Sequence, residues 1–268
     1  ILSIAFAPSG EFFVTAGVKS IKMWNFDRGH PVTTQSSASA EVKCMASRNV
    51  DLAEMKDKTF TSVTLNEKNI FGMTQDGVLC VFTYERVMDR WMDLHADAGY
   101  TLYCSGNLLV CGCSEGIIRC FDASTLEHFV TLPRPPPLGH ANISPDKKRQ
   151  VIATDSNSTF ADNLGLLLFS NNTRLFSVYS DRTVFVWDIS KLNLVSVFRA
   201  SLNHSGPIND IQILPSSTLE LTQFVTGSGD KTIRFWNICH VNPKELQGKY
   251  IRNIYSKDLS RILYVSNS

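Results

Sequence analysis

Apolar and polar residues alternate along the run 224–237, which reads FVTGSGDKTIRFWN. Residues 224–226 suit an extended strand, residues 227–230 are turn formers, and residues 231–236 alternate as a half-buried strand does. The run therefore predicts a β-hairpin.

The same arrangement recurs at 175–188 and, in a third copy, at 13–25. In 175–188 the turn Asp, a basic residue, Thr and Trp stand at the same offsets as in 224–237. A unit that repeats in this way cannot bury its apolar face alone and must stack on its neighbours. No long segment shows a helical period, so the pattern predicts an all-β protein built from repeated sheets.

The strand pattern divides the chain into five groups, which we call blades, near residues 1–26, 59–83, 100–122, 164–188 and 204–238. The segments 30–58 and 133–163 are predicted to be two long loop insertions, because they are polar or proline-rich and lack alternation. Residues 194–199 are predicted to form an outer strand ahead of the last blade. The tail, 250–268, is either an outer strand or a connection to a following domain.

Three of the blades close with a tryptophan followed by a small polar residue, at Trp24-Asn25, Trp187-Asp188 and Trp236-Asn237. This pattern resembles the WD-repeat family, whose four-stranded antiparallel blades pack radially into a β-propeller. The resemblance implies about five blades of a longer propeller region, with the tail leading to a following propeller. Phe82 and Phe121 stand where the other blades have tryptophan.

The last blade carries the full polar set of the family, His204, Thr226, Asp230 and Trp236. A buried indole N–H needs an acceptor, which the threonine hydroxyl can supply while it bonds to histidine. The turn aspartate can then accept from the other imidazole nitrogen and fix its tautomer. The other blades keep parts of this structural network, namely Ser177, Asp181 and Trp187 in the fourth blade and Trp24 in the first.

Thr226, His204 and Asp230 also have the residue types of a nucleophile, a base and an orienting carboxylate. The structural interpretation is favoured, because the pattern includes the tryptophan that the network serves. No other ionisable residues converge as an enzyme would require, so the sequence predicts a non-catalytic protein with no cofactor and no metal.

The charge balance adds little to this picture. The 268 residues carry a formal net charge of +1, which leaves no electrostatic footprint for nucleic acid. Lys147, Lys148 and Arg149 form the tightest basic cluster, and a solvated loop is the simplest interpretation of it. No apolar run approaches the ~20 residues of a membrane helix. The chain begins at Ile1 with no initiator methionine, as a segment of a longer protein would.

Seven cysteines are present, and most of them stand inside apolar strand patterns. Cys111 and Cys113 share one face of a strand, but no second pair at zinc-ligand spacing accompanies them. We therefore predict reduced core cysteines and a cytoplasmic setting, with a metal site or a disulfide as the alternative.

Several islands outside the blade pattern resemble the mitogen-activated protein kinase-binding protein family, which includes the spindle-pole WD-repeat protein linked to microcephaly. They are 77–82 (GVLCVF), 86–91 (RVMDRW), 109–116 (LVCGCSEG), 132–135 (LPRP) with Leu138-Gly139, and 253–256 (NIYS). The resemblance implies a scaffold that binds components of the c-Jun N-terminal kinase pathway or of the centrosome and spindle pole.

That family implies the cytoplasm, the centrosome or spindle pole and the nucleus as locations, and other proteins as partners. Nucleic acid and membrane are not expected as partners, and the oligomeric state stays open. A ciliary or other microtubule-associated assembly role is the alternative. Candidate partner contacts are the insertion residues Arg134, Pro135, Lys147, Lys148 and Arg149.

Overall fold

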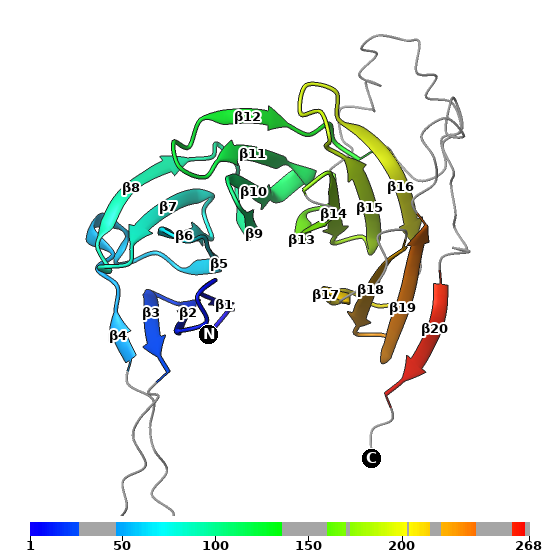
Figure 1. Ribbon diagram of the computed structural model, residues 1–268, viewed down its shortest axis with the longest axis horizontal. Helices are drawn as coiled ribbons and strands as arrows, with labels where there is room; N and C mark the ends of the chain where they lie inside the picture. The colour runs from blue at the N-terminus through cyan, green and yellow to red at the C-terminus, as the bar shows by residue number, and fades with distance from the viewer. Residues whose placement is uncertain are drawn as a thin grey trace, which may run out of the picture. The chain divides into compact units, whose positions relative to one another are not determined.

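The computed structural model describes residues 1–26, 47–135, 160–169, 172–202, 204–214, 221–239 and 259–265. Within these residues, strands β1 to β20 form four-stranded antiparallel sheets, and the only helices are two short 3-10 turns (Figure 1). The predicted all-β fold class is confirmed. The chain divides into two compact units, Ile1–Gly106 and Asn107–Ser268.

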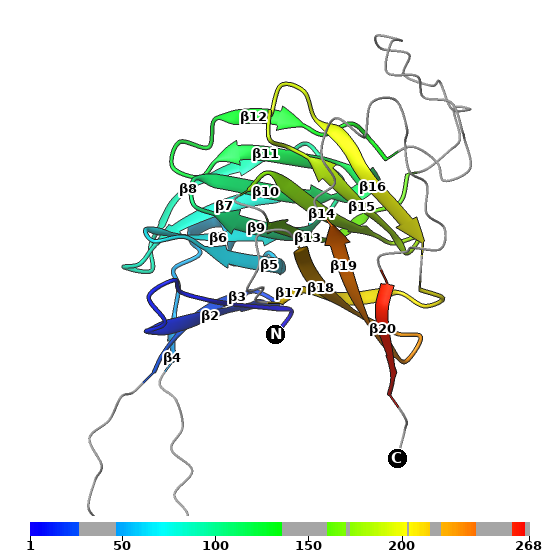
Figure 2. The same cartoon turned by 45° about the vertical axis from the view of Figure 1, so that its right-hand side comes forward.

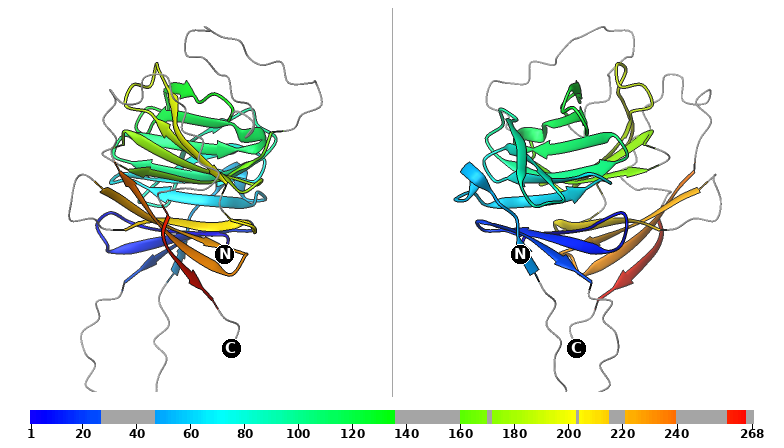
Figure 3. Two further views of the ribbon diagram at one scale, coloured as in Figure 1. Left: turned by 90° about the vertical axis from the view of Figure 1, so that its right-hand side faces the viewer. Right: turned by 60° about the vertical axis from the view of Figure 1, so that its left-hand side comes forward.

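The first unit contains two complete sheets. The first sheet has the order β1 (Ser3–Phe6), β2 (Phe12–Gly17), β3 (Ser20–Asn25), β4 (Ser47–Asn49). The second has the order β5 (Phe60–Leu65), β6 (Asn69–Thr74), β7 (Val78–Thr83), β8 (Met88–Asp93). The last strand of the unit is β9 (Gly99–Ser105). Successive strands of each sheet lie side by side, as Figures 2 and 3 show from other directions.

The second unit contains the remaining strands. Within this unit the third sheet has the order β12 (His128–Thr131), β11 (Ile118–Asp122), β10 (Leu108–Cys113). The fourth consists of β13 (Asn163–Phe169), β14 (Arg174–Tyr179), β15 (Thr183–Asp188) and β16 (Ser196–Leu202). The fifth consists of β17 (Ile208–Leu214), β18 (Leu221–Ser228), β19 (Thr232–Cys239) and β20 (Leu259–Tyr264).

The described part of the segment 30–58 differs from the predicted insertion. Residues 47–49 form β4, which pairs with β3, and a 3-10 turn, η1 (Ala53–Met55), follows it. Val50, Leu52 and Met55 are buried in the same core cluster as Phe82. The strand could not be predicted from the sequence, because β4 is exposed along its whole length and therefore shows no alternation of apolar and polar residues.

The outer strands complete the sheets. The outer strand predicted at residues 194–199 is found at residues 196–202 as β16, which pairs with β15 and completes the fourth sheet. In the tail, β20 pairs with β19, so the outer-strand alternative holds for residues 259–264. Residues 136–159 of the second insertion, with Lys147, Lys148 and Arg149, lie outside the described residues.

The hairpin between the second and third strands of a sheet needs a residue with positive φ. Gly77 supplies it in the second sheet at φ 78°, and Lys19, Arg182 and Lys231 supply it elsewhere at φ 51°, 72° and 64°. Three basic residues thus occupy a conformation that favours glycine. The aspartates before two of them, Asp181 and Asp230, stabilise the turn by accepting the backbone N–H two residues further on, each at 3.0 Å.

Candidate functional site

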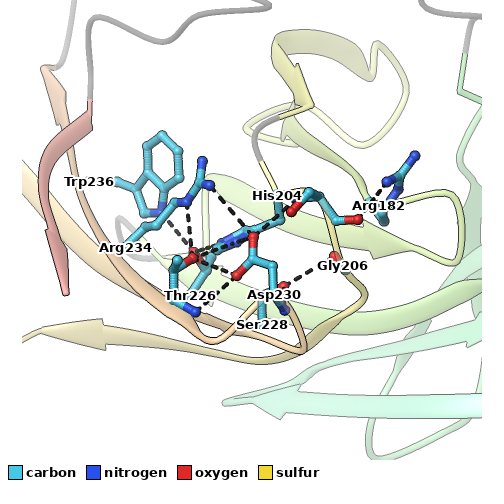
Figure 4. A network of polar contacts seen from close by, with 10 residues as sticks. Arg182, His204, Gly206, Thr226, Ser228, Asp230, Arg234 and Trp236 are labelled. Atoms are coloured by element: carbon cyan, nitrogen blue, oxygen red, sulfur yellow. Dashed lines mark hydrogen bonds and ion pairs between the residues drawn. The ribbon is translucent and has the colours of Figure 1, made fainter. Parts of the chain in front are cut away.

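The fifth sheet brings the four side chains predicted to form a network into one hydrogen-bonded chain (Figure 4). Trp236 Nε1 lies 2.9 Å from Thr226 Oγ1, which lies 2.7 Å from His204 Nε2. His204 Nδ1 lies 2.9 Å from Asp230 Oδ2. The residues come from β18, β19 and the segments before β17 and β19, so the chain of bonds ties the hairpin to the start of the sheet.

The donors and acceptors of this chain fix the state of the imidazole. Nδ1 faces the ionised Asp230 carboxylate, which can only accept, so the imidazole proton stands on Nδ1. In the neutral ring Nε2 then accepts from the Thr226 hydroxyl, whose oxygen accepts from the Trp236 indole N–H. Burial lowers the pKa of His204, although Asp230 opposes this shift, so the imidazole is neutral.

Asp230 is the hub of the network. Its Oδ1 accepts from the Thr232 hydroxyl at 2.6 Å, and its Oδ2 accepts from the Ser205 N–H at 3.1 Å. Arg234 Nη2 lies 3.5 Å from Oδ2. Burial opposes ionisation of this carboxylate, but the bonds from Thr232, His204 and Ser205 outweigh it and hold the pKa of Asp230 well below its usual value.

The same geometry weighs against a catalytic triad. Thr226 is 1% exposed and His204 is 4% exposed, so a substrate cannot reach the hydroxyl. The Thr226 oxygen is also shared between the indole and the imidazole. A satisfied buried network of this kind stiffens a small sheet, which is the role that the geometry supports.

The fourth sheet keeps the tryptophan bond without a described imidazole. Trp187 Nε1 donates to Ser177 Oγ at 2.8 Å, and both residues are fully buried. Asp181 accepts from the Thr183 hydroxyl at 2.6 Å, as Asp230 does from Thr232. The segment before Phe160, where an equivalent of His204 would be sought, lies outside the described residues.

The indole and its acceptor occur together in the sequence. In the first sheet Trp24 Nε1 donates to Thr15 Oγ1 at 2.9 Å, the equivalent bond. In the second and third sheets Phe82 and Phe121 replace the tryptophan, and register puts Gly72 and Cys111 at the acceptor positions. A phenyl ring has no N–H that needs an acceptor, so the sheets that lack the tryptophan also lack the Ser or Thr hydroxyl at the acceptor position. This pairing could have been found in the sequence, since it needs only the hairpin register.

Arg134, a predicted partner contact, is engaged within its own unit. Its Nη2 lies 2.9 Å from Glu115 Oε2, and its guanidinium carbon lies 4.7 Å from the ring centroid of Phe160. The Glu115 N–H donates to Asp162 Oδ1 at 2.9 Å. These contacts hold the two ends of the segment 136–159 together. Pro135 also faces inward, with Cδ 3.2 Å from where a Cβ on Gly116 would lie.

Among the described residues, the first sheet has an apolar face that is partly exposed. In each sheet one apolar residue of the second strand stands two positions before the residue at the acceptor position. This residue is buried in four sheets, as Ile70, Leu109, Leu175 and Phe224, but in the first sheet Phe13 is only half-buried. Phe13 stacks on Trp24 with centroids 5.9 Å apart, and Phe6, which is 64% exposed, lies 5.6 Å from Phe13. In the fifth sheet the equivalent Phe224 is covered by Phe176 of the fourth sheet at 4.3 Å.

Most of the described cysteines are core residues. Cys80, Cys111, Cys113 and Cys120 are buried and Cys104 is half-buried, and burial raises the pKa of Cys80 to about 12. In the described part of the chain, no three His, Cys, Asp or Glu side chains are grouped as a metal site would require. None of the described helices has the length and apolar character needed to cross a bilayer.

Known proteins resemble the chain at two levels. The WD40 family model (WD domain, G-beta repeat) matches residues 194–237. A chain in a crystal structure of the mitotic checkpoint complex superposes with a TM-score of 0.61 at 17% identity, covering 88% of this chain and 60% of that one. The second comparison concerns the fold alone.

Two curated relatives match over the whole chain. Mitogen-activated protein kinase-binding protein 1 of Mus musculus is 30% identical over 279 residues, and WD repeat-containing protein 62 of Sus scrofa is 28% identical over 276 residues. The matched region is 18% of the first relative and 17% of the second. The chain therefore spans under a fifth of the length of these relatives.

Repeated four-stranded sheets with buried tryptophan networks, together with the WD40 match over residues 194–237, show the fold of a WD-repeat β-propeller. Within that class the chain is similar along its full length to mitogen-activated protein kinase-binding protein 1 and WD repeat-containing protein 62. The family resemblance predicted from the sequence islands is confirmed.

Proposed function

We propose that the chain is part of a non-catalytic scaffold that holds other proteins on the loops and edges of its blades. The observation that carries the proposal is the buried network around Asp230, in which the polar groups that could serve chemistry are bonded to one another and closed to solvent. The outer strands and the connecting loops are exposed to solvent. Loops held by a rigid framework are common binding surfaces.

The proposed partners are components of the c-Jun N-terminal kinase pathway or proteins of the centrosome and spindle pole. Support comes from the whole-chain similarity to a protein named for binding mitogen-activated protein kinases. The proposed location is the cytoplasm, with the centrosome or spindle pole and the nucleus as further sites. A ciliary or other microtubule-associated assembly role is the second candidate, and it rests on analogy of fold alone.

Affinity purification of the longest natural protein that contains this chain, followed by mass spectrometry, tests the proposal. We expect kinase-pathway or centrosomal proteins to be enriched with the intact chain. A matched protein with Gly206→Ala, which disturbs the fifth sheet, is the control for binding that depends on the fold. Enrichment of ciliary components alone would favour the second candidate. Conversion of a small-molecule substrate by the purified protein would contradict a non-catalytic scaffold role.

A further inference from the structure

An exposed tryptophan stands on the outer strand of the second sheet. Trp91 is 48% exposed at the middle of β8, which ends the strand order of its sheet and pairs with β7. Among the described residues, no strand pairs with the other edge of β8. An edge of this kind presents backbone N–H and C=O groups to any extended segment that can reach them.

The indole of Trp91 is held in place. Its N–H donates to the Glu54 carboxylate, which η1 presents from the segment between β4 and β5. That segment is fixed in turn, because Leu52 and Met55 on either side of Glu54 are buried at 7% and 5% exposure. Trp91 is therefore a rigid aromatic surface, the kind of residue that dominates binding energy at interfaces.

Carboxylates flank the indole. Asp93 stands two residues after Trp91 and shares its face of β8. Asp89 is the extra residue of a β-bulge, because Met88 pairs with Phe82 and Arg90 pairs with Val81. The side chains of Asp89 and Asp93 are 47% and 53% exposed. Arg90 Nε lies 3.5 Å from Asp89 Oδ2, and His95 Nδ1 lies 3.6 Å from Asp93 Oδ2. Exposed pairs at these distances are worth about 0–1 kcal/mol, so they leave the carboxylates available to a partner.

We propose that the open edge of β8 binds an extended segment of a partner protein that carries Lys or Arg at alternate positions. Such a segment adds to the sheet through backbone hydrogen bonds and turns every second side chain toward the face of Trp91. Its basic residues then lie near Asp89, Asp93 and Glu54, and one of them stacks on the indole. The exposed carboxylates repel an acidic or phosphorylated segment.

This inference rests on the proposed scaffold function and names one of its binding surfaces. The outer strand β12 offers a control, because Phe129 is 42% exposed there but is flanked at two residues' distance by Glu127 and Thr131 rather than by two carboxylates.

Fluorescence anisotropy with a labelled synthetic peptide, alternating Lys or Arg with Val and Thr, tests the proposal on the full chain. We expect Trp91→Ala to weaken binding about tenfold or more. The double change Asp89→Asn and Asp93→Asn should weaken binding and reduce its salt dependence, whereas Phe129→Ala should leave both unchanged. The same peptide with alternate residues N-methylated should not bind, because it cannot pair with the edge.

Three results would overturn the proposal. They are no binding of the basic peptide, equal binding to Trp91→Ala, and self-association of the chain that Trp91→Ala abolishes, since the edge would then serve a second copy. Thermal unfolding of each variant, expected to match the wild type, separates lost binding from lost folding. If the natural protein still captures its partners when Trp91 is changed, this surface is wrong while the scaffold function stands.

Discussion

Trp236 donates its indole N–H to the hydroxyl of Thr226 at 2.9 Å across the paired strands β18 and β19. The two residues are 4% and 1% exposed, so water cannot replace this bond. The same pairing in the first and fourth sheets shows that the WD pattern is a structural unit of an indole and an acceptor. The stability of each such sheet should depend on the pair.

The hydroxyl of Thr226 can be tested by isosteric replacement. Thr226→Val leaves the Trp236 N–H and the His204 Nε2 without their partner, and we expect it to cost about 1–3 kcal/mol for each buried group left unsatisfied. Thr226→Ser keeps the hydroxyl, as Ser177 does beside Trp187 in the fourth sheet, and should cost much less. Chemical denaturation of the two variants measures the difference, and equal midpoints would show that the bond contributes nothing.

The burial of Trp236 gives a second prediction. Trp236→Ala should destabilise the chain by about 3–5 kcal/mol, because it removes a large buried side chain and leaves a cavity. Trp91→Ala is the matched control, since it removes the same side chain from an exposed place and should cost little. Thermal unfolding distinguishes the two variants, and a melting temperature unchanged in Trp236→Ala would refute the assigned burial.

The stability of the fifth sheet should fall in mild acid. The pKa of His204 lies below its ordinary value of 6.5, so the unfolded chain takes up this proton at a higher pH than the folded chain does. Stability is therefore constant above that value and decreases as the pH falls from about 6.5 toward the lower, folded-state pKa. His204→Gln should lose this component, while a slope retained in the variant would assign the effect to other groups.

Asp230, a carboxylate rather than an imidazole, affects the stability at a lower pH. Its folded pKa lies well below the ordinary value of 3.8, so its contribution is complete above that pH and is lost only in stronger acid. The two residues therefore produce separate steps in a plot of unfolding free energy against pH. In His204→Gln the upper step should vanish and the lower step should become smaller, because His204 helps to lower the pKa of Asp230.

The hairpins and the tryptophan sets could be predicted from the sequence because both obey local rules. Alternation fixes the three inner strands, and Thr226 and Trp236 are brought together by the register of a single hairpin. Strands such as β4 could not be predicted from the sequence, because exposed edge strands need no apolar face. The bond between Trp91 and Glu54 could not be predicted either, because it joins residues 37 positions apart and no local sequence pattern indicates such a contact.

The close approach of Gly206 to the turn of the fifth sheet gives a further prediction. A Cβ at this position would lie 2.6 Å from the Asp230 nitrogen and 2.9 Å from the Gly229 carbonyl carbon, and the backbone cannot move away freely. Gly206→Ala should cost about 1–3 kcal/mol. Gly227→Ala, where nothing lies within 4 Å of the added Cβ, is the control and should stay within about 0.5 kcal/mol. Equal stabilities would contradict the packing at this turn.

The contacts of Arg134, Glu115, Phe160 and Asp162 define how the second insertion can be shortened without disturbing the sheets. Deleting residues 141–156 keeps all four anchors, and shortening a loop changes its closure entropy only slowly with length. We expect the variant to melt within a few degrees of the wild type but to lose at least one protein partner in affinity purification. A Gly/Ser replacement of equal length controls for spacing. If the deletion leaves every captured partner in place, the insertion is not a binding element, and the partners must engage the outer strands and the shorter loops.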